Sequence, residues 1–378
     1  MSKFELAPYP YDRIKDIIDD ASRKFSQLLD LSVGTPCDDP PSMLMKEMSS
    51  SGSAVNGYPP SKGTPEYLLS VSKWLNRTCG VDIETNQISA CVGTKEFVAS
   101  LPHYLRLRTP EKNVVAGPKL AYPTYEMGAK LAGCDYVGLA ETGIGIDLEY
   151  LDEIDNLLCL WVNSPGNPTG HLEDLQRVAK WANLKGVPVI SDECYMEYNW
   201  IGPPDTILKY GKKNVLALHS LSKRSNAAGI RVGSFCGDPD LVYYLTEIRK
   251  HAGAMVAGPL LHAASAALYD DEHVQMQRDR YLERLRIFSD ALSNIGLKVS
   301  LPDGGFYLWA KIMGAPPGAD GSEPLSWAWT SWLANNFGVI VAPGDLYGES
   351  GDSFLRIAMV QPTNEIVAVA DKISKFVV

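Results

Sequence analysis

The side chains best suited to chemistry gather in three short polar segments in the middle of the chain. Each segment directly follows an apolar run, and the three are 163–170 (NSPGNPTG), 192–195 (DECY) and 220–223 (SLSK). They combine a lysine amine, which can act as a nucleophile and a proton carrier, with a carboxylate, amides and hydroxyls. In open α/β sheets, ligands bind beyond the carboxyl ends of the strands. The order of the segments therefore predicts one reactive site at one edge of one sheet.

Each segment also has a purely structural explanation. Asn, Gly and Pro dominate turns for steric reasons, so 163–170 is compatible with a simple turn. Asp192 is compatible with a helix cap, and a serine-flanked lysine such as Lys223 with a solvated surface position. The functional interpretation is favoured by the common position of all three segments after apolar runs.

The elements that must position these segments alternate along the chain. Short apolar runs, typical of buried strands, cover 157–162, 187–191, 215–219 and 232–236. Between the first two runs, 171–186 has apolar residues at helical spacing and a glycine at its end. This β-α-β order predicts a parallel sheet with right-handed crossovers.

A second, smaller domain is expected towards the C-terminus. A charged amphipathic pattern predicts a long helix over 272–292, and strands are expected near 298–301, 307–310 and 354–358. We therefore expect three parts, namely an N-terminal segment (1–45) that joins the small domain, a large domain (46–275) and a small C-terminal α/β domain (276–378).

Composition narrows the class of protein. The 378 residues are 45% hydrophobic and 21% charged, enough to bury a sizeable core, and the formal net charge is -10. An acidic chain has no excess of cations to replace counterions, so we expect no nucleic-acid partner and no membrane partner. The longest apolar run, 157–162, is too short to span a bilayer, and no signal peptide is visible.

Cysteine and histidine usage points away from metal sites. The seven cysteines are scattered without a CxxC pair, and the six histidines show no HExxH spacing. Reduced thiols of this kind favour a cytoplasmic protein without a structural zinc ion.

The segment 220–233 (SLSKRSNAAGIRVG) contains the most specific motif. With Arg231 eight residues after Lys223, it resembles the lysine motif of the class I and II aminotransferases, fold type I enzymes that use pyridoxal 5'-phosphate. The resemblance covers about residues 31–358. It implies an α/β fold in which a large domain has a mostly parallel sheet flanked by helices and a smaller α/β domain is attached.

The resemblance implies roles for the side chains that follow the expected strands. Lys223 would bond covalently to the cofactor aldehyde and later move the substrate proton. Asp192 would pair with the pyridine nitrogen and keep it protonated. Tyr195 and Asn167 would hydrogen-bond the phenolic oxygen, and Asn163 would contact the substrate nearby.

The resemblance also implies a phosphate site and a cover for the cofactor ring. The residues expected at the phosphate offer a guanidinium, hydroxyls and backbone amides, and they are Arg231, Ser220, Ser222, Gly93, Thr94 and Lys95. Tyr122 would stack on the pyridine ring, although a plain core position also fits an aromatic residue there. Tyr58 would reach the phosphate of a neighbouring subunit, which implies a homodimer with composite active sites; a mobile Pro-rich loop is the alternative.

Two further residues correspond to the substrate side of the family's site. Arg356 matches the arginine that grips the substrate α-carboxylate, since a guanidinium fork makes a two-point contact that a lysine cannot make. Gly34 would bring a backbone amide to the same carboxylate. The expected partners are thus small amino and keto acids.

Transamination is the favoured reaction, and two alternatives stay open. They are a C–S lyase on the same fold and a non-catalytic regulator that binds the cofactor. Segments most similar to the succinyldiaminopimelate aminotransferases are 9–12 (YPYD), 31–36 (LSVGTP), 219–226 (HSLSKRSN) and 249–253 (RKHAG).

That family transfers the amino group of glutamate to N-succinyl-2-amino-6-oxopimelate, in lysine and diaminopimelate biosynthesis. An aminotransferase specific for aspartate or LL-diaminopimelate is the alternative. A long dicarboxylate needs a distal cation, for which Arg224, Lys62 and Lys95 are candidates by position.

Overall fold

The computed structural model describes residues 10–142, 145–319 and 321–376, which form two compact units. Unit 1 comprises the chain up to Gly34, residues 281–301 and the chain from Phe306 onward, and unit 2 comprises 35–280 and 302–305. Within the described ranges, no helix is long and apolar enough to cross a membrane.

The limits of the two units differ from the domain boundaries expected at residues 45 and 275. One division lies after Gly34, and the other falls after Arg280, inside the long helix α10 (Glu272–Asn294). The expected boundary at 275 and the observed division both lie inside this helix, and a continuous helical pattern carries no signal of where one unit ends. The short segment 302–305 belongs to unit 2 because its backbone bonds to the loops that follow β7 and β8.

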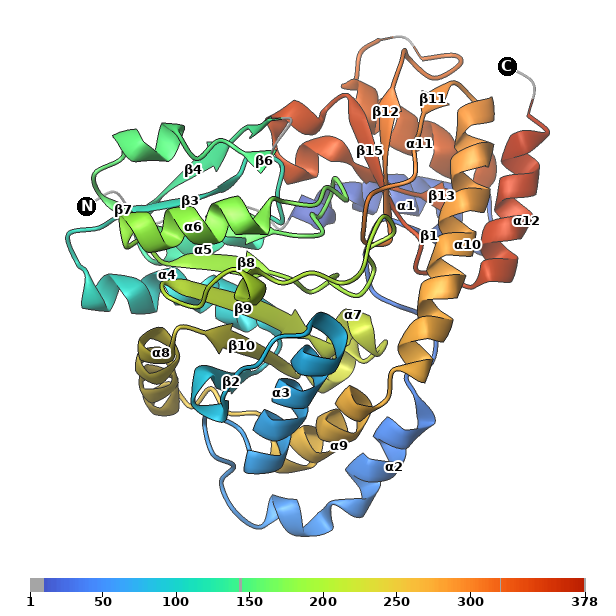
Figure 1. The fold of residues 1–378 in the computed structure, drawn as a ribbon. Helices are drawn as coiled ribbons and strands as arrows, with labels where there is room; N and C mark the ends of the chain where they lie inside the picture. Colours follow the sequence, from blue (N-terminus) through green and yellow to red (C-terminus); the bar gives the residue numbers. More distant parts are fainter. Residues whose placement is uncertain (1–9, 143–144, 320, 377–378) are drawn as a thin grey trace. The chain divides into compact units, whose positions relative to one another are not determined.

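Unit 2 is built on a seven-stranded sheet (Figure 1). In order across the sheet, its strands are β2 (Ile88–Cys91), β10 (Gly233–Gly237), β9 (Val215–Ser220), β8 (Val189–Asp192), β7 (Leu157–Asn163), β3 (Val114–Pro118) and β4 (Asp135–Leu139). The pairs from β9 to β4 are parallel, whereas β10 is antiparallel to both β9 and β2. The predicted parallel sheet is confirmed for these central strands, and the run at 232–236 forms an antiparallel one.

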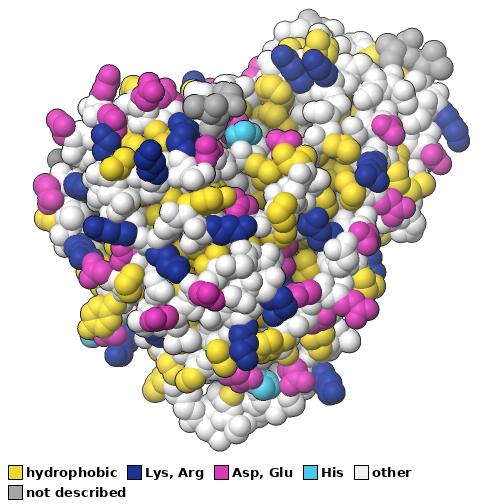
Figure 2. Space-filling model, viewed as in Figure 1, with side chains coloured by type: hydrophobic (Ala, Val, Ile, Leu, Met, Phe, Trp, Pro, Cys, Tyr) yellow, Lys and Arg dark blue, Asp and Glu magenta, His cyan; other side chains and the backbone are white. Residues whose placement is uncertain are grey.

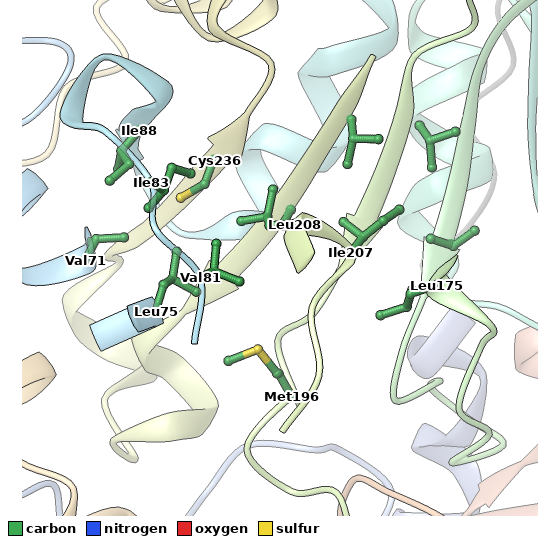
Figure 3. Close-up of a cluster of buried hydrophobic side chains, with 14 of the residues drawn as sticks. Val71, Leu75, Val81, Ile83, Ile88, Leu175, Met196, Ile207, Leu208 and Cys236 are labelled. Atoms are coloured by element: carbon green, nitrogen blue, oxygen red, sulfur yellow. The ribbon is translucent and has the colours of Figure 1, made fainter. Parts of the chain in front are cut away.

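Both faces of the interior strands of this sheet are buried, which explains why these strands are mainly apolar. In β9, Val215 and Ala217 belong to one core cluster, while Leu216 and Leu218 belong to another. Figure 3 shows part of the first cluster, in which side chains from the flanking helices pack over the strands. The side chains of Asp192 and Glu193, at the end of β8, consequently project to opposite faces.

Helices cover this sheet, and α6 is the predicted crossover. The helices of unit 2 are α2 (Ser42–Ser50), α3 (Pro65–Cys79), α4 (Thr94–Arg108), α5 (Thr124–Leu131), α6 (Leu175–Lys185), α7 (Leu221–Arg224), α8 (Pro239–His251), α9 (Gly258–Tyr269) and the start of α10. The helix α6 begins later than residue 171 because Asp174 caps it, accepting from the Arg177 N–H (2.9 Å). Gly186 ends it in a left-handed conformation with φ of 66°.

Short elements complete unit 2. The strands β5 (Glu141–Thr142) and β6 (Gly145–Ile146) pair antiparallel. Its 3-10 helices are η2 (Gly52–Val55), η3 (Thr85–Gln87), η4 (Tyr150–Glu153), η5 (Ile207–Lys209) and η6 (Ala228–Ile230).

Unit 1 carries a four-stranded sheet in the order β11 (Leu297–Lys298), β12 (Tyr307–Ile312), β15 (Phe354–Ala358) and β14 (Ala342–Pro343). A parallel pair, β1 (Leu29–Asp30) and β13 (Val339–Ile340), lies in the same unit. Its other elements are α1 (Lys15–Ser22), the end of α10, α11 (Leu325–Phe337), α12 (Thr363–Ser374), η1 (Pro10–Ile14), η7 (Gly344–Tyr347) and η8 (Glu349–Gly351). The strands predicted near 307–310 and 354–358 are present. The strand expected at 298–301 is shorter, because the chain leaves the sheet before Pro302.

Charged side chains are mixed on the molecular surface. On the face drawn in Figure 2, Lys and Arg side chains lie among Asp and Glu side chains instead of forming one basic field. This distribution agrees with the acidic net charge of -10.

Candidate active site

The carboxyl ends of β7 and β8 lie side by side, as the sequence predicts. Asn163 and Asp192, the last residues of these strands, are partners in the parallel ladder. The Asn163 amide donates to the carbonyls of Asp192 (2.8 Å) and Pro165 (3.1 Å). Its oxygen accepts from the backbone N–H of Asn167 (2.8 Å). Asn163 therefore uses both amide hydrogens to fix the 163–170 loop next to Asp192.

The carboxylate of Asp192 is buried and held by hydrogen-bond donors. Asp192 is 7% exposed and accepts from the Tyr125 hydroxyl (2.8 Å) and from the Cys194 backbone N–H (3.2 Å). Burial raises the pKa of the Asp192 carboxyl above its usual value, and hydrogen bonds from Cys194 and Tyr125 act against that rise. A carboxylate with these properties is suited to pairing with a cationic ring nitrogen.

Tyr125 is a site residue that the sequence motifs do not identify. It is fully buried, stacks on Trp161 at a centroid distance of 5.0 Å and meets Tyr122 edge-on at 5.8 Å. Tyr122 precedes α5 and Tyr125 lies in its first turn, and the Tyr125 N–H donates to the Tyr122 carbonyl (3.1 Å). The three-residue separation of the two tyrosines is the sequence signal that points to Tyr125 once Tyr122 is expected at the site.

Lys223 lies on α7, the short helix that follows β9. Ser220 caps this helix, accepting from the Ser222 N–H (3.1 Å), and the Tyr198 hydroxyl donates to the Lys223 carbonyl (2.8 Å). Burial raises the pKa of the Cys194 thiol well above its usual value, while the positive charge of Lys223 acts in the opposite direction. The strand β9, which α7 follows, is the parallel neighbour of β8, with Leu218 opposite Asp192.

Arg224, the neighbour of Lys223, is anchored inside unit 2. It is 4% exposed and forms ion pairs with Glu197 (2.9 Å) and Asp271 (3.0 Å). Its guanidinium also donates to the carbonyl of Ala267 (2.8 Å). The expectation that Arg224 supplies a distal substrate cation is therefore wrong, because burial among carboxylates already engages its charge. These contacts instead hold the backbone next to Lys223.

The residues expected at the phosphate gather where α4 begins. Gly93 has φ of 70°, and a Cβ at this position would overlap the Arg231 guanidinium. Arg231 also has a left-handed backbone, with φ of 55°, and donates to the Ala228 carbonyl (3.0 Å). The Thr94 hydroxyl lies 3.3 Å from the Cys194 sulfur. A glycine at position 93 is thus required by the close approach of the arginine, and this group adjoins the end of β8.

The other residues expected at the cofactor occupy different environments. Tyr195, Ser220 and Ser222 are buried. The Lys95 amine lies 5.9 Å from the centroid of the Tyr122 ring. Tyr58 is 95% exposed, on the loop between α2 and α3. Its expected contact is in another subunit and stays a prediction.

Unit 1 brings Arg356 and Gly34 to the same tyrosine. Arg356, on β15, is 1% exposed and donates to the Ser32 carbonyl. Its guanidinium carbon lies 4.4 Å from the centroid of the Tyr307 ring. A Cβ at Gly34 would overlap the Tyr307 hydroxyl. The two residues expected to bind a substrate carboxylate are therefore neighbours in the fold of unit 1.

The donor set at the end of the unit 2 sheet fits pyridoxal 5'-phosphate. Asp192 offers a buried carboxylate for a protonated ring nitrogen. Arg231 offers a guanidinium packed against the Gly93 backbone, and such a fork suits a phosphate. Lys223 adds an amine on the short helix that follows β9, the strand next to β8.

Comparisons with known proteins agree with this fit. The family model described as "Aminotransferase class I and II" matches residues 26–373. The chain is 36% identical over 378 residues to 4-dedimethylamino-4-oxo-anhydrotetracycline transaminase OxyQ of Streptomyces rimosus, covering 98% of this chain and 99% of that protein. It is 30% identical over 388 residues to the LL-diaminopimelate aminotransferase of Aquifex aeolicus, covering 97% of this chain and 96% of that protein.

A solved structure extends the likeness to the fold. The structure of a probable N-succinyldiaminopimelate aminotransferase from Thermus thermophilus superimposes with a TM-score of 0.85 at 26% identity, covering 97% of this chain and 99% of that one. The family model covers nearly the whole chain, and the likenesses extend over almost all of each relative. The chain therefore belongs to the class I and II aminotransferases, and it is a pyridoxal 5'-phosphate-dependent enzyme of fold type I that acts on amino and keto acids.

Proposed function

We propose that this aminotransferase moves the amino group of glutamate to N-succinyl-2-amino-6-oxopimelate, a step of lysine and diaminopimelate biosynthesis. The observation that carries the proposal is the full-length likeness to two proteins named for diaminopimelate substrates, from Aquifex aeolicus and Thermus thermophilus. The segment 219–226, which contains Lys223, is also similar to the succinyldiaminopimelate aminotransferases.

Residues of unit 2 would hold the cofactor. Those assigned to its ring and reactive carbon are Lys223, Asp192, Tyr195, Asn167 and Tyr122, and those assigned to its phosphate are Arg231, Ser220, Ser222, Gly93, Thr94 and Lys95. When bound, pyridoxal 5'-phosphate supplies an aldehyde that takes up the amino group and a protonated ring that withdraws electrons. Asp192 keeps the ring nitrogen protonated, and the face of Tyr122 excludes water from it.

Lys223 is the residue that moves the proton. Its Nζ would take the proton from the substrate α-carbon and hold it for the second transfer, which requires an amine held in a fixed place. Two contacts support that requirement, namely the Tyr198 hydroxyl on the Lys223 carbonyl (2.8 Å) and the ion pairs of Arg224. Asn163 acts beside it by fixing the 163–170 loop, which positions Asn167.

Arg356 and the backbone amide of Gly34 would bind the α-carboxylate of the substrate. A buried guanidinium supports this assignment, because a charge-assisted two-point contact is strongest away from water. For the distal carboxylate we propose Lys95, whose amine lies over the Tyr122 ring at 5.9 Å. Partial burial lowers the pKa of Lys62, which makes that lysine the weaker candidate.

The test is a panel of keto acids offered, with glutamate as donor, to the enzyme loaded with pyridoxal 5'-phosphate. We expect the highest kcat/KM with N-succinyl-2-amino-6-oxopimelate, and no turnover in Lys223→Ala. Borohydride reduction followed by mass spectrometry should find the cofactor on Lys223 in the wild type. Lys180→Ala, an exposed lysine of α6, is the matched control and should behave as the wild type. Full activity in Lys223→Ala would overturn the assignment.

One observation favours a different amino acceptor from the pimelate. The identity to OxyQ, 36% over nearly all of both chains, exceeds the identities to the two proteins named for diaminopimelate substrates. OxyQ is named for a polycyclic ketone. A 4-oxo-anhydrotetracycline therefore belongs in the panel, and amination of this ketone in preference to the pimelate would replace the first proposal.

We further propose that the enzyme is a homodimer with composite active sites. The loop that carries Tyr58 projects this side chain into solvent, where it is 95% exposed, as expected for a residue that serves a neighbouring subunit. Mixing and refolding inactive Tyr58→Ala and Lys223→Ala variants should restore part of the activity, because hybrid dimers regain one intact site. Each variant refolded by itself is the control. A mixture that regains no activity would argue against shared sites.

A further inference from the structure

Arg356 lies among three tyrosines, which we call the tyrosine cage. Tyr307 and Tyr347 have ring centroids 4.4 Å and 4.6 Å from the guanidinium carbon, and the centroid of Tyr11 is 5.9 Å away. The three rings come from β12, η7 and η1, which are separate parts of unit 1. All three distances are within the range of a cation–π interaction. The cage therefore stabilises the charge of Arg356, which is 1% exposed.

The cage is joined by a hydrogen bond between two of its hydroxyls. The oxygens of Tyr11 and Tyr347 lie 2.5 Å apart, and their rings meet edge-on at 6.4 Å. Burial raises the pKa of Tyr347 well above its usual value, so this phenol stays neutral and keeps its hydrogen. This bond connects residues 336 positions apart in sequence and ties η1 to η7 across Arg356.

Two buried arginines of unit 2 have a carboxylate partner in addition to an aromatic ring. Arg249 pairs with the Glu96 carboxylate at 2.6 Å, and Arg224 pairs with Glu197 at 2.9 Å. Aromatic faces contact the plane of a guanidinium and do not compete for its N–H donors, whereas a carboxylate partner occupies them. The tyrosine rings therefore stabilise the charge of Arg356 from the faces of its guanidinium plane.

One ring of the cage, Tyr307, packs against the backbone of Gly34. Any side chain at Gly34 would overlap the Tyr307 hydroxyl, so the backbone at Gly34 directly limits the position of this ring. The residue proposed to offer its amide to the substrate carboxylate therefore also supports the cage.

We propose that Tyr11 and Tyr347 are positioning residues for the substrate α-carboxylate: their linked hydroxyls hold the tyrosine cage around Arg356, so that η1 near the N-terminus sets the affinity for the carboxylate. The proposal rests on the role of Arg356 given above. Loss of the hydroxyl bond lets the guanidinium take several orientations, and only a fraction of them match the carboxylate.

The experiment uses the loaded enzyme and the variants Tyr11→Phe, Tyr347→Phe and the double variant. We expect KM for 2-oxoglutarate to rise about tenfold in each single variant while kcat changes less than about twofold, as one lost hydrogen bond on the binding side predicts. The double variant should be no worse than either single one, since both changes remove the same bond. A KM equal to that of the wild type in Tyr11→Phe would overturn the proposal.

Tyr281→Phe is the matched control. Tyr281 is fully buried in unit 1, and its ring lies 5.7 Å from the guanidinium carbon of another buried arginine, Arg284. The Tyr281→Phe substitution tests the general effect of removing a buried phenol hydroxyl from this unit. An equal rise of KM in this control would show that unit 1 is merely loosened, and it too would overturn the proposal.

A binding measurement separates this proposal from the proposed function. Titration calorimetry gives the Kd of 2-oxoglutarate for the loaded enzyme without any turnover. If the wild type binds 2-oxoglutarate and Tyr11→Phe weakens binding about tenfold, the role proposed for Tyr11 and Tyr347 is supported, even if none of the keto acids is aminated. If the wild type aminates the pimelate and Tyr11→Phe binds 2-oxoglutarate as tightly as the wild type does, the proposed function is supported. The role proposed for Tyr11 and Tyr347 is then overturned.

Discussion

One buried charge in each unit, Asp192 in unit 2 and Arg356 in unit 1, is stabilised by different means. In unit 2, Asp192 is 7% exposed and is surrounded by donors, the Tyr125 hydroxyl at 2.8 Å and the Cys194 N–H at 3.2 Å. In unit 1, Arg356 is 1% exposed and is surrounded by aromatic rings, the nearest with its centroid at 4.4 Å.

This difference follows from the chemistry of the two ions. A carboxylate has only lone pairs, so a buried one requires N–H or O–H groups directed at it. A guanidinium is flat and delocalised, so the negative faces of aromatic rings can stabilise it without using its donors. In the function proposed here, the opposite charge is a ring nitrogen at Asp192 and a substrate carboxylate at Arg356.

Removal of the Asp192 carboxylate should cause a large loss of activity. In Asp192→Ala, the cofactor ring loses the partner of its protonated nitrogen, and we expect kcat to fall about 10³-fold, as for other electrostatic groups that act on the reacting centre. Steady-state kinetics at saturating cofactor measure this loss. The control is Asp174→Ala, which removes a carboxylate that only caps α6 and should lower stability without changing kcat. If both variants behave alike, Asp192 is a cap and not a cofactor ligand.

Replacement of Arg356 tests the other half of the comparison. Arg356→Lys keeps the charge but removes the planar fork, so KM for both glutamate and 2-oxoglutarate should rise about 10- to 100-fold, which corresponds to about 1.5–3 kcal/mol for a charged hydrogen bond. The smaller, more strongly hydrated ammonium should also gain less from the tyrosine rings. Arg284→Lys, at another buried arginine of unit 1, should leave KM near the value of the wild type. A fall in kcat without a rise in KM would contradict the assigned role.

The sequence predicts the strand-end site but not the surroundings of either ion. Because a parallel sheet is covered on both faces, its strands are continuous apolar runs, and the polar residues that follow them stand out. The bonds Tyr125–Asp192 and Tyr11–Tyr347 join residues 67 and 336 positions apart, so they exist only once the chain has folded. Nothing in local spacing distinguishes the buried Arg224 from an exposed arginine.

Tyr125→Phe tests one of the hydrogen-bond donors around Asp192, and its expected effect on activity is smaller. Loss of one hydrogen bond to the carboxylate raises the pKa of Asp192 further and weakens its hold on the ring nitrogen. We expect kcat/KM to fall about five- to tenfold, in line with about 1 kcal/mol for one hydrogen bond. Tyr136→Phe removes a phenol that donates to the Pro118 carbonyl at 2.9 Å and serves as the control. Equal losses in the two variants would mean that Tyr125 acts through packing alone.

The smallest expected effect is on stability, and it follows from the sign of the pKa shift. Burial raises the pKa of Asp192 in the folded state above the unfolded value of about 3.9. In cofactor-free protein, the stabilising contribution of protonated Asp192 is therefore complete below about pH 3.9 and is lost as the pH rises through the raised value. Asp192→Asn lacks this titration, so the Tm of the wild type minus that of the variant should decrease by about 2 °C from about pH 4 to about pH 8. Added pyridoxal 5'-phosphate should reverse the decrease, because it supplies the cation that the buried carboxylate requires. A Tm difference that does not change with pH would show that the donors alone balance the burial of Asp192, and the contrast with the aromatic surroundings of Arg356 would then lose its energetic basis.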